Sequence, residues 1–343
     1  MPHQQKINDY LISVVIPTCD RKGSLMSLLA SLNRSIYPIS EVIIVDSSDY
    51  VLVPEDYMTF TQLSIRYLRG ERSVCIQRNL GIREARSPFI FLCDDDMEVP
   101  ADYLQLLVAH IRAHPEAGAV TGLVLQEEDG GWQGGYPVRK GSELIRKFIF
   151  QQGIWGEIEC PDNLLLKRIK RYYRRKGNHI SRAGWPVLTQ LSGDYVITPI
   201  YTLGASLVRK KWLRDSPYDE VLDRNGIGDN YGVAVGFPAA GIHLLPHAVV
   251  YHYRAATNRL QHSVQYLRRV LALDYFIQTK KELRHIKKGW LIWSLTGNCL
   301  SAVLGRDRAM LRSALKTLRL VAFGPNPYLQ SAKNTQRITE PTL

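Results

Sequence analysis

The first third of the chain alternates short apolar runs with segments in which leucine recurs every three to four residues. The apolar runs have the composition of strands buried on both faces of a sheet. These predicted strands are Leu11–Pro17, Glu41–Asp46, Ile65–Leu68, Phe89–Cys93 and Ala119–Leu125. Between them, residues 24–33, Ser73–Ala85 and a segment with Pro100 in its first turn are predicted helices. Strict alternation of strand and helix predicts an α/β fold, a mainly parallel sheet with helices on both faces.

The middle of the chain resumes this pattern only after a long interruption. Tyr201–Val208 and Leu244–Tyr253 are two further predicted strands. Residues 129–200 separate them from the first five strands and begin with a glycine-rich segment, GGWQGG. The position of this insertion suggests a ligand-binding element. Its tryptophans could stack on the rings of a bound ligand or simply belong to a core: Trp132, Trp155 and Trp185.

Basic amphipathic helices are predicted for residues 254–323. In the last of them an apolar stripe from Met310 to Val321 lies opposite a basic face formed by Arg308, Arg312, Lys316 and Arg319. Such helices commonly lie in a membrane interface. Packing on the rest of the chain and formation of a homo-oligomer are alternatives. Residues 289–305 carry no charge and include two tryptophans, but their serine, threonine and asparagine favour an interfacial or buried helix over a membrane span. Residues 324–343 are predicted to form a flexible tail.

Composition and charge narrow the class of protein. The 343 residues are 45% apolar, so a large core is expected, as one large domain or two smaller ones. Five scattered cysteines without a CxxC pair argue against a disulfide framework or a zinc site and fit a reducing compartment. Residues 1–10 lack an apolar signal core.

The net charge of +12 is concentrated in residues 167–182 and 254–319. This concentration indicates an anionic partner such as a membrane surface or nucleic acid. A solvated basic face is the plainer alternative.

Three aspartates follow the predicted strand Phe89–Cys93: Asp94, Asp95 and Asp96. Adjacent carboxylates repel by roughly 3 kcal/mol per pair at an effective dielectric constant near 20, so such a cluster raises a pKa or recruits a cation. Hard oxygen ligands in an open arrangement select Mg²⁺ or Mn²⁺, which keep waters and substrate phosphates as further ligands. A solvated acidic turn is the alternative. Ligands in parallel sheets bind beyond the carboxyl ends of the strands, where these residues are expected to lie.

Three ordered motifs carry a resemblance to a known family. VVIPTCDR near the N-terminus, IIVDSS in the second strand and IQRNLGIREARSPFIFLCDDD before the aspartates resemble the corresponding segments of family-2 glycosyltransferases of the GT-A fold, the last of them leading into the DXD motif. The resemblance covers residues 12–125. It implies transfer of a sugar from a nucleotide-diphosphate-sugar with the help of Mn²⁺ or Mg²⁺.

The resemblance also implies roles for single residues in binding the nucleotide. The backbone of Pro17 and the side chain of Thr18 would border the base, and Asp46 would hydrogen-bond to it. Arg78 and Asn79 would contact the base or ribose.

For the aspartates, the resemblance implies that Asp94 and Asp95 face the ribose or first phosphate and that Asp96 ligates the metal. Arg21 is near enough in sequence to help bind the diphosphate, or it is a surface cation. The chain departs from the family pattern where serine, cysteine and aspartate replace the usual residues: Ser47, Cys93 and Asp20. These departures leave the identity of the base open.

Inverting transfer needs a general base on the acceptor hydroxyl. The family usually supplies it from an acidic pair that opens a helix. Asp229 and Asn230 occupy that place here, and an amide cannot accept the proton, so Asp229 is the predicted base, with a helix N-cap as its other role. Asp219 and Glu220 are weaker alternatives. His252, at the end of the last predicted strand, matches a histidine that ligates the metal or contacts the diphosphate in several relatives, although a packed strand histidine is equally consistent with its position.

The sequence therefore predicts a GT-A catalytic domain over residues 1–253, with a nucleotide-sugar-binding half at 12–125 and an acceptor half at 201–253. The expected reaction is inverting transfer to a hydroxyl of a glycan or lipid-linked acceptor, on the cytoplasmic, inner face of the cell membrane. A nucleotidyltransferase is the alternative enzyme, but no glycine-rich phosphate loop follows Pro17. A basic nucleic-acid-binding protein is the alternative from another class, and no helix-turn-helix, zinc or RNP signature favours it.

Overall fold

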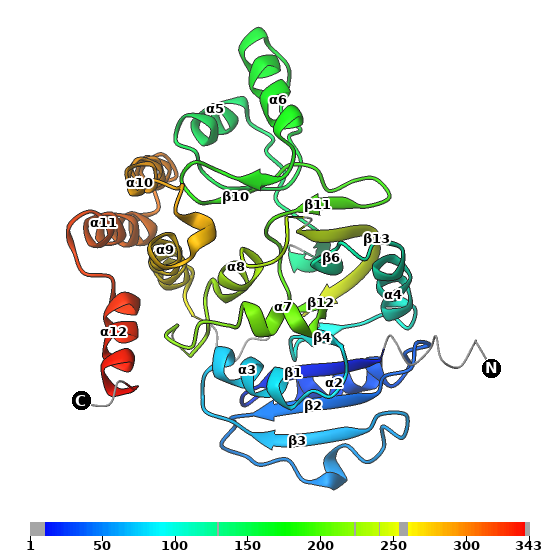
Figure 1. The fold of residues 1–343 in the computed structure, drawn as a ribbon. Helices are drawn as coiled ribbons and strands as arrows, with labels where there is room; N and C mark the ends of the chain where they lie inside the picture. The colour runs from blue at the N-terminus through cyan, green and yellow to red at the C-terminus, as the bar shows by residue number, and fades with distance from the viewer. Residues whose placement is uncertain (1–10, 129, 223, 240, 254–259, 340–343) are drawn as a thin grey trace. The chain divides into compact units, whose positions relative to one another are not determined.

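The computed structural model describes residues 11–128, 130–222, 224–239, 241–253 and 260–339, with side chains up to residue 334. The polar segment 1–10 lies outside the described residues. The chain divides into two compact units (Figure 1). The first comprises Met1–Gly135, Leu191–Glu220 and Gly236–Arg259, and the second Tyr136–Gln190, Val221–Val235 and Leu260–Leu343.

The first unit is built on one large sheet, in which eight strands follow the order β11-β13-β6-β12-β4-β1-β2-β3. Their bounds are β1 Ile12–Thr18, β2 Glu41–Asp46, β3 Ile65–Arg69, β4 Phe89–Cys93, β6 Ala119–Glu128, β11 Val196–Thr198, β12 Ala205–Arg209 and β13 Ile242–His252. Two short strands pair outside this path, β5 Met97–Glu98 with β13 and β7 Gly131–Gln133 with β6. Strands β1, β2, β3 and β4 run parallel, as do β6 and β13, whereas β12 and β11 are antiparallel to their neighbours. The expected mainly parallel sheet is confirmed.

Helices cover both faces of this sheet, as expected. Gly81 of α3 (Val74–Glu84) lies so close to Val15 of β1 that an added Cβ would overlap the valine side chain. Tyr103 of α4 (Tyr103–Ala113) contacts Phe91, which is the register partner of Val14. Because successive residues of a strand point to opposite faces, α3 and α4 lie on opposite sides. The first unit also contains α2 (Lys22–Leu32), whose predicted leucine stripe is buried, the short helix α7 (Lys210–Asp215) and one 3-10 turn, Pro54–Asp56.

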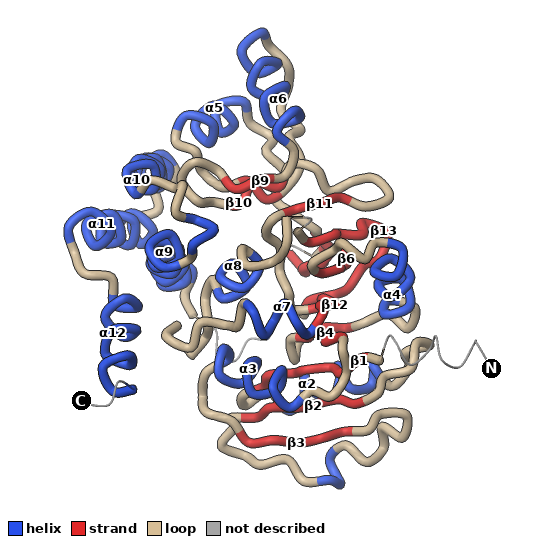
Figure 2. The backbone as a smooth tube through the Cα atoms, viewed as in Figure 1, coloured by secondary structure: helices blue, strands red, loops and turns tan. Residues whose placement is uncertain are grey.

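The second unit joins most of the insertion to the C-terminal helices (Figure 2). Its small sheet has the order β8-β10-β9, formed by Ile154–Trp155, Pro186–Leu188 and His179–Ile180. Its helices are α5 Gly141–Ile149, α6 Leu164–Lys176, α8 Asp229–Ala234, α9 His262–Thr279, α10 Lys288–Leu304, α11 Arg308–Phe323 and α12 Pro327–Thr339, with a 3-10 turn at Lys281–Leu283. One apolar core holds α5, α6 and the small sheet together through Leu144, Leu166 and Val187. The basic stretch predicted at 167–182 therefore belongs largely to α6.

Several element bounds differ from the sequence prediction. Of the predicted strand Tyr201–Val208, only the part from Ala205 pairs with a neighbour. Helix α4 begins at Tyr103, so Pro100 precedes its first turn. The predicted flexible tail instead contains α12, because Asn326 accepts a hydrogen bond from the backbone N–H of Tyr328 (2.9 Å) and Pro327 opens the helix. No helix in the part of the chain that the structure describes combines the length and apolar character needed to cross a bilayer.

Candidate active site

The polar residues predicted to form a site gather at the carboxyl edge of the large sheet. Thr18 at the end of β1 pairs in register with Asp46 at the end of β2, and the aspartates 94–96 follow β4 directly. Strand β5 brings in His252, because Met97 pairs with this last residue of β13. The backbone N–H of Tyr253 also donates to the carbonyl of Asp96 (2.9 Å). One edge of the sheet therefore collects residues that are far apart in the sequence. The acidic cluster denotes Asp94, Asp95 and Asp96 together with Arg21 and His252.

Asp96 lies between an imidazole and a guanidinium. Its Oδ1 is 3.2 Å from Nε2 of His252, and its Oδ2 accepts a hydrogen bond from Arg21 at 3.2 Å. The residue is buried. Burial opposes ionisation, but the hydrogen bond and charge of His252 and the charge of Arg21 outweigh it and hold the pKa of Asp96 below its ordinary value. Asp96 therefore carries a negative charge at neutral pH beside a histidine nitrogen.

Asp95 is held by Thr18 and by the same guanidinium. Thr18 Oγ1 donates to its Oδ2 (2.7 Å), and Arg21 donates to its Oδ1 (3.1 Å). Burial, together with the neighbouring charge of Asp96, raises the pKa of Asp95 to about 6 despite the attraction of Arg21. Arg21 is thus the cation that the two carboxylates share, and its positive charge offsets part of their mutual repulsion.

Arg78 and Asn79 of α3 lie at the same edge but have different partners. Arg78 forms an ion pair with Asp94 and lies over the ring of Tyr218, 5.0 Å from its centroid. The amide of Asn79 donates to the carbonyl of Tyr218 (2.9 Å) and to Glu220 (2.8 Å), and its oxygen accepts from the Tyr218 N–H (3.0 Å). Arg78 therefore reaches the acidic cluster, whereas Asn79 anchors the segment 218–220.

Asp46 is fully buried at the end of β2. Its Oδ1 accepts hydrogen bonds from the N–H (2.8 Å) and hydroxyl (2.5 Å) of Ser48, and its Oδ2 accepts from Tyr67 (2.8 Å) and Arg69 (3.3 Å). These four hydrogen bonds fix the turn that follows β2. In this structure Asp46 positions Ser48 at the edge of the sheet.

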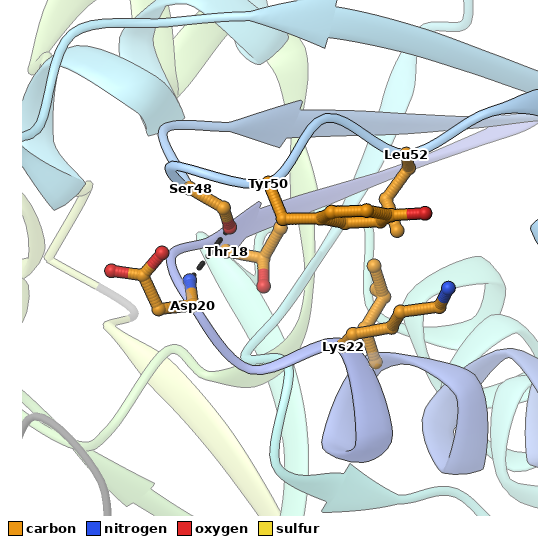
Figure 3. A pocket seen from close by; sticks show the side chains of 7 residues that line it. Thr18, Asp20, Lys22, Ser48, Tyr50 and Leu52 are labelled. Atoms are coloured by element: carbon orange, nitrogen blue, oxygen red, sulfur yellow. Dashed lines mark hydrogen bonds between the residues drawn. The ribbon is translucent and has the colours of Figure 1, made fainter.

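A pocket of about 410 Å³ opens beside this turn (Figure 3). Its lining comes from the ends of β1 and β2 and from the start of α2: Thr18, Asp20, Lys22, Leu25, Ser48, Tyr50 and Leu52. The backbone N–H of Asp20 donates to Ser48 Oγ (2.6 Å), which joins the two loops. Asp20 has φ +56°, a left-handed conformation that Asn and Asp tolerate best after glycine, so an aspartate suits the place where the family usually has asparagine.

Some lining residues were not among the candidates from the sequence. Lys22, Ser48 and Tyr50 lie in or next to loops after strands, and their only sequence signal is proximity to the predicted strand ends. Pro17 is buried within β1 and precedes the pocket residue Thr18. Nine of the site residues predicted from the sequence thus lie at this edge of the first unit: Thr18, Arg21, Asp46, Arg78, Asn79, Asp94, Asp95, Asp96 and His252.

The predicted base Asp229 belongs to the second unit, where it is the first residue of α8 and 6% exposed. Its Oδ1 accepts a hydrogen bond from the N–H of Asn230 (2.6 Å). Gly228, which precedes it, has φ +97°, a conformation that favours glycine. The alternatives Asp219 and Glu220 lie in the first unit, and Glu220 is bound to Asn79.

The fold is shared with solved structures of the S. aureus protein TarS. The S. aureus protein TarS, residues 1–349, matches with a TM-score of 0.53 at 14% identity, covering 97% of this chain and 93% of that one. The same TarS fragment in complex with UDP-GlcNAc matches with a TM-score of 0.51 at 12% identity over the same shares. At these identities the likeness shows the fold alone, and that fold is the GT-A type expected from the resemblance.

The sequence comparisons define the family more closely. Residues 13–168 match the model of glycosyl transferase family 2. The uncharacterized glycosyltransferase YwdF of Bacillus subtilis (strain 168) is 30% identical over 131 residues, which is 38% of this chain and 48% of the relative. The match thus spans about half the length of that relative. The segment 13–168, a little under half of the chain, thus matches glycosyl transferase family 2, which confirms the resemblance seen in the three motifs.

Proposed function

We propose that this protein transfers a sugar, with inversion, from a nucleotide-diphosphate-sugar to a hydroxyl of a glycan or lipid-linked acceptor. The observation that carries the proposal is the acidic cluster beside a pocket of about 410 Å³ at the carboxyl edge of a GT-A sheet. That volume is within the range of small-molecule sites. The nucleotide base would occupy the pocket, bordered by Thr18 and Ser48, and the diphosphate would lie toward the aspartates. Because TarS residues 1–349 were solved with UDP, uridine diphosphate is the first nucleotide to test.

Asp96 and His252 are the proposed ligands of Mn²⁺ or Mg²⁺. The pair supplies a charged carboxylate and an imidazole nitrogen that lie 3.2 Å apart. The ion pairs of Arg21 with Asp95 and Asp96 indicate that these carboxylates attract a positive charge. One protein carboxylate, one imidazole and the oxygens of a diphosphate suit Mn²⁺ in particular. A bound divalent ion would offset the charge that develops on the leaving diphosphate.

The side chains of this chain would then orient the donor. Asp94 and Asp95 would accept hydrogen bonds from the ribose or contact the first phosphate through the bound metal ion. Arg78 holds Asp94 in place, and Thr18 holds Asp95. Arg21 would bind the diphosphate once the carboxylates have another cation. Asp46 would act on the base, directly if its present partners rearrange and through Ser48 otherwise. Asn79, whose amide now anchors Tyr218, would need to exchange those bonds to reach the ribose.

Asp229 is the proposed general base that takes the proton of the acceptor hydroxyl. It opens a helix, as the acid pair of the family does, and Asn230 beside it cannot accept a proton. Asp229→Asn is expected to lower kcat at least 100-fold with little change in donor binding. Unchanged turnover in this variant would exclude Asp229, and Asp219 and Glu220 would be tested next.

We further propose that the protein acts at the cytoplasmic face of a membrane. Helices α10 and α11 expose large apolar side chains, among them Val303, Leu304, Leu315 and Phe323, beside the exposed basic residues of α11. An apolar and basic helical surface of this kind favours an interfacial position. A nucleotidyltransferase or a nucleic-acid-binding protein explains neither the family match nor this combination of surfaces.

Thermal unfolding measured with UDP, GDP and dTDP, each with and without Mn²⁺, tests the donor site. One nucleotide is expected to raise the midpoint strongly only when Mn²⁺ is present. Asp96→Asn should abolish the metal-dependent part, whereas Asp102→Asn, an exposed aspartate outside the cluster, should retain it. If no nucleotide stabilises the protein, or if Asp96→Asn responds like the unsubstituted chain, the proposed function is wrong.

A further inference from the structure

Three histidines form a second cluster in the first unit, away from the residues discussed so far. His110 and His114 are four residues apart in α4 and share one helical face, and His243 is the second residue of β13. One ring nitrogen from each lies within 4.8 Å of those of the other two. The closest pair is His110 Nε2 and His243 Nδ1, at 2.9 Å. The imidazole cluster denotes these three residues.

The imidazole cluster lies at the opposite edge of the sheet from the acidic cluster. His243 is near the amino end of β13, and His252 is its last residue. Nine residues of extended chain span about 30 Å. Strand β13 runs parallel to β6, and β6 and β4 are both antiparallel to β12, so the amino end of β13 is remote from the aspartates that follow β4. The two clusters therefore have separate surroundings.

The surroundings of the imidazole cluster suit a metal. His243 is buried, and His110 and His114 are half-buried. A neutral imidazole offers one nitrogen lone pair to a metal ion. His243 is 1% exposed, and its Nε2 has no hydrogen-bond partner among the residues that the structure describes.

A carboxylate is placed to orient one of the rings. His114 Nδ1 and Glu116 Oε1 are 3.0 Å apart, so a proton on Nδ1 donates to Glu116 and leaves Nε2 as the lone pair. Histidine ligands of metals commonly have such a carboxylate partner. Stacking explains part of the arrangement, because the ring of Tyr195 lies 5.1 Å from that of His243 and 4.8 Å from that of His110. Stacking does not account for the convergence of three ring nitrogens.

We propose that His110, His114 and His243 bind one Zn²⁺ ion, with Glu116 orienting His114 and a water as fourth ligand. Tetrahedral zinc with nitrogens at about 2.0 Å separates them by roughly 3.3 Å, so the 2.9 Å pair must open slightly and the more distant nitrogen must approach. Since His110 and His114 are only half-buried, solvent can supply the fourth ligand. The ion would join the end of α4 to the start of β13. Three imidazoles favour zinc over Mg²⁺, which prefers oxygen.

Zinc titration of the chelator-treated full chain tests this site. One equivalent of Zn²⁺ is expected to bind to the unsubstituted chain and to Asp96→Asn, which impairs only the acidic cluster. The double variant His110→Gln/His114→Gln should lose at least 100-fold in zinc affinity, and Glu116→Gln should lose about 10- to 100-fold. These positions are preferred to the fully buried His243, whose replacement endangers folding.

Two further measurements separate the possible outcomes. Co²⁺ bound in place of zinc should give the intense visible absorption of a tetrahedral ion, which an octahedral ion at carboxylates does not give. The double variant must retain its circular dichroism and its nucleotide-dependent stabilisation. If the unsubstituted chain binds no zinc, or the folded double variant binds it equally well, the proposal is overturned, whatever the result for the donor site.

Discussion

At the residue scale, Arg21 is the group on which the charge balance of the acidic cluster depends. It bridges two buried carboxylates, with its guanidinium 3.1 Å from Asp95 and 3.2 Å from Asp96. Removing a cation from this position leaves the carboxylates to repel each other. A divalent ion would offset that repulsion, so Arg21 and the metal act on the same pair of charges.

Arg21→Gln is therefore expected to lower the free energy of unfolding of the metal-free protein by about 1–3 kcal/mol. Mn²⁺ should raise the midpoint of this variant more than that of the unsubstituted chain, because the ion restores the missing charge. Arg139→Gln, which breaks an exposed ion pair with Glu159, should leave the Mn²⁺ response unchanged. Thermal unfolding across a Mn²⁺ series measures both. An equal or smaller response of Arg21→Gln would show that Arg21 does not compensate the charges that the metal binds.

Gly204 offers a second test at the residue scale. A Cβ at this position would overlap the carboxylate of Asp94, 2.8 Å from its Cγ, and would lie 3.2 Å from Met97 Cε. Gly204→Ala is expected to displace Asp94 and to raise the KM for the donor about 10-fold or more, with the fold retained, since the overlap involves side chains only. Gly23→Ala is the matched control, because nothing lies within 4 Å of its Cβ. A donor KM equal in the two variants would argue against a role for Asp94.

How much of the site the sequence predicted depends on how far apart its partners are. The carboxylates that end a strand could be found from local pattern. The bonds from Asn79 to Tyr218 and Glu220 join residues about 140 positions apart, and no local pattern carries that information. The imidazole cluster is intermediate: His110 and His114 have visible helical spacing, whereas His243 joins them only through the sheet.

At the element scale, Glu41 joins the first strands at their amino ends. Its Oε1 accepts from Ser13 (2.7 Å) and from the N–H of Arg86 (2.7 Å), and its Oε2 accepts from Arg66 (2.9 Å). Burial alone would raise its pKa, but these hydrogen bonds and the charge of Arg66 lower the pKa of Glu41 below its ordinary value of 4.5. The ionised carboxylate therefore stabilises β1 and β2.

Glu41→Gln should lower the free energy of unfolding by about 2 kcal/mol at pH 7. Because the folded-state pKa is the lower one, the contribution of the carboxylate is complete above pH 4.5 and is lost as the pH falls through the folded-state pKa. Urea unfolding from pH 7 to pH 3 should show the two proteins converging below pH 4.5. Glu84→Gln, which breaks the exposed pair of Arg66, should cost less. A difference that stays constant with pH would contradict this account.

The elements themselves were predicted unevenly for a physical reason. A buried parallel strand such as β2 has an uninterrupted apolar interior, here Val42–Val45, with a charged residue at each end, so its sequence bounds coincide with the observed ones. Tyr201 and Leu203 are equally buried but lie outside β12, because burial in a loop produces the same apolar signal as burial in a strand. Helix α12 depends on Asn326, whose amide donates to Asp274 (2.9 Å), a tertiary contact with α9 that periodicity does not reveal.

At the scale of the whole molecule, part of the net charge of +12 comes from a row of basic residues in the second unit, where it can act on a membrane. Arg308, Arg312, Lys316 and Arg319 are all exposed on α11. On the same helices Leu304 is 65% exposed and Phe323 90% exposed. Exposed apolar side chains of this size beside a basic row are costly in water and suited to the boundary between headgroups and acyl chains.

Binding to vesicles should therefore have a charged and an apolar component. Each basic residue near an anionic surface contributes about 1 kcal/mol, so Arg312→Glu/Lys316→Glu should weaken binding to phosphatidylglycerol vesicles at least 10-fold. Leu304→Ser/Phe323→Ser should weaken it in a way that added salt does not mimic, because salt screens only the charged component. Arg34→Glu/Lys211→Glu makes the same charge change on the first unit and should bind as the unsubstituted chain does. Co-sedimentation with anionic and neutral vesicles across a salt series measures these differences. Equal binding of both charge-reversal variants would mean that net charge, and not the surface of α10 and α11, attracts the protein to the membrane.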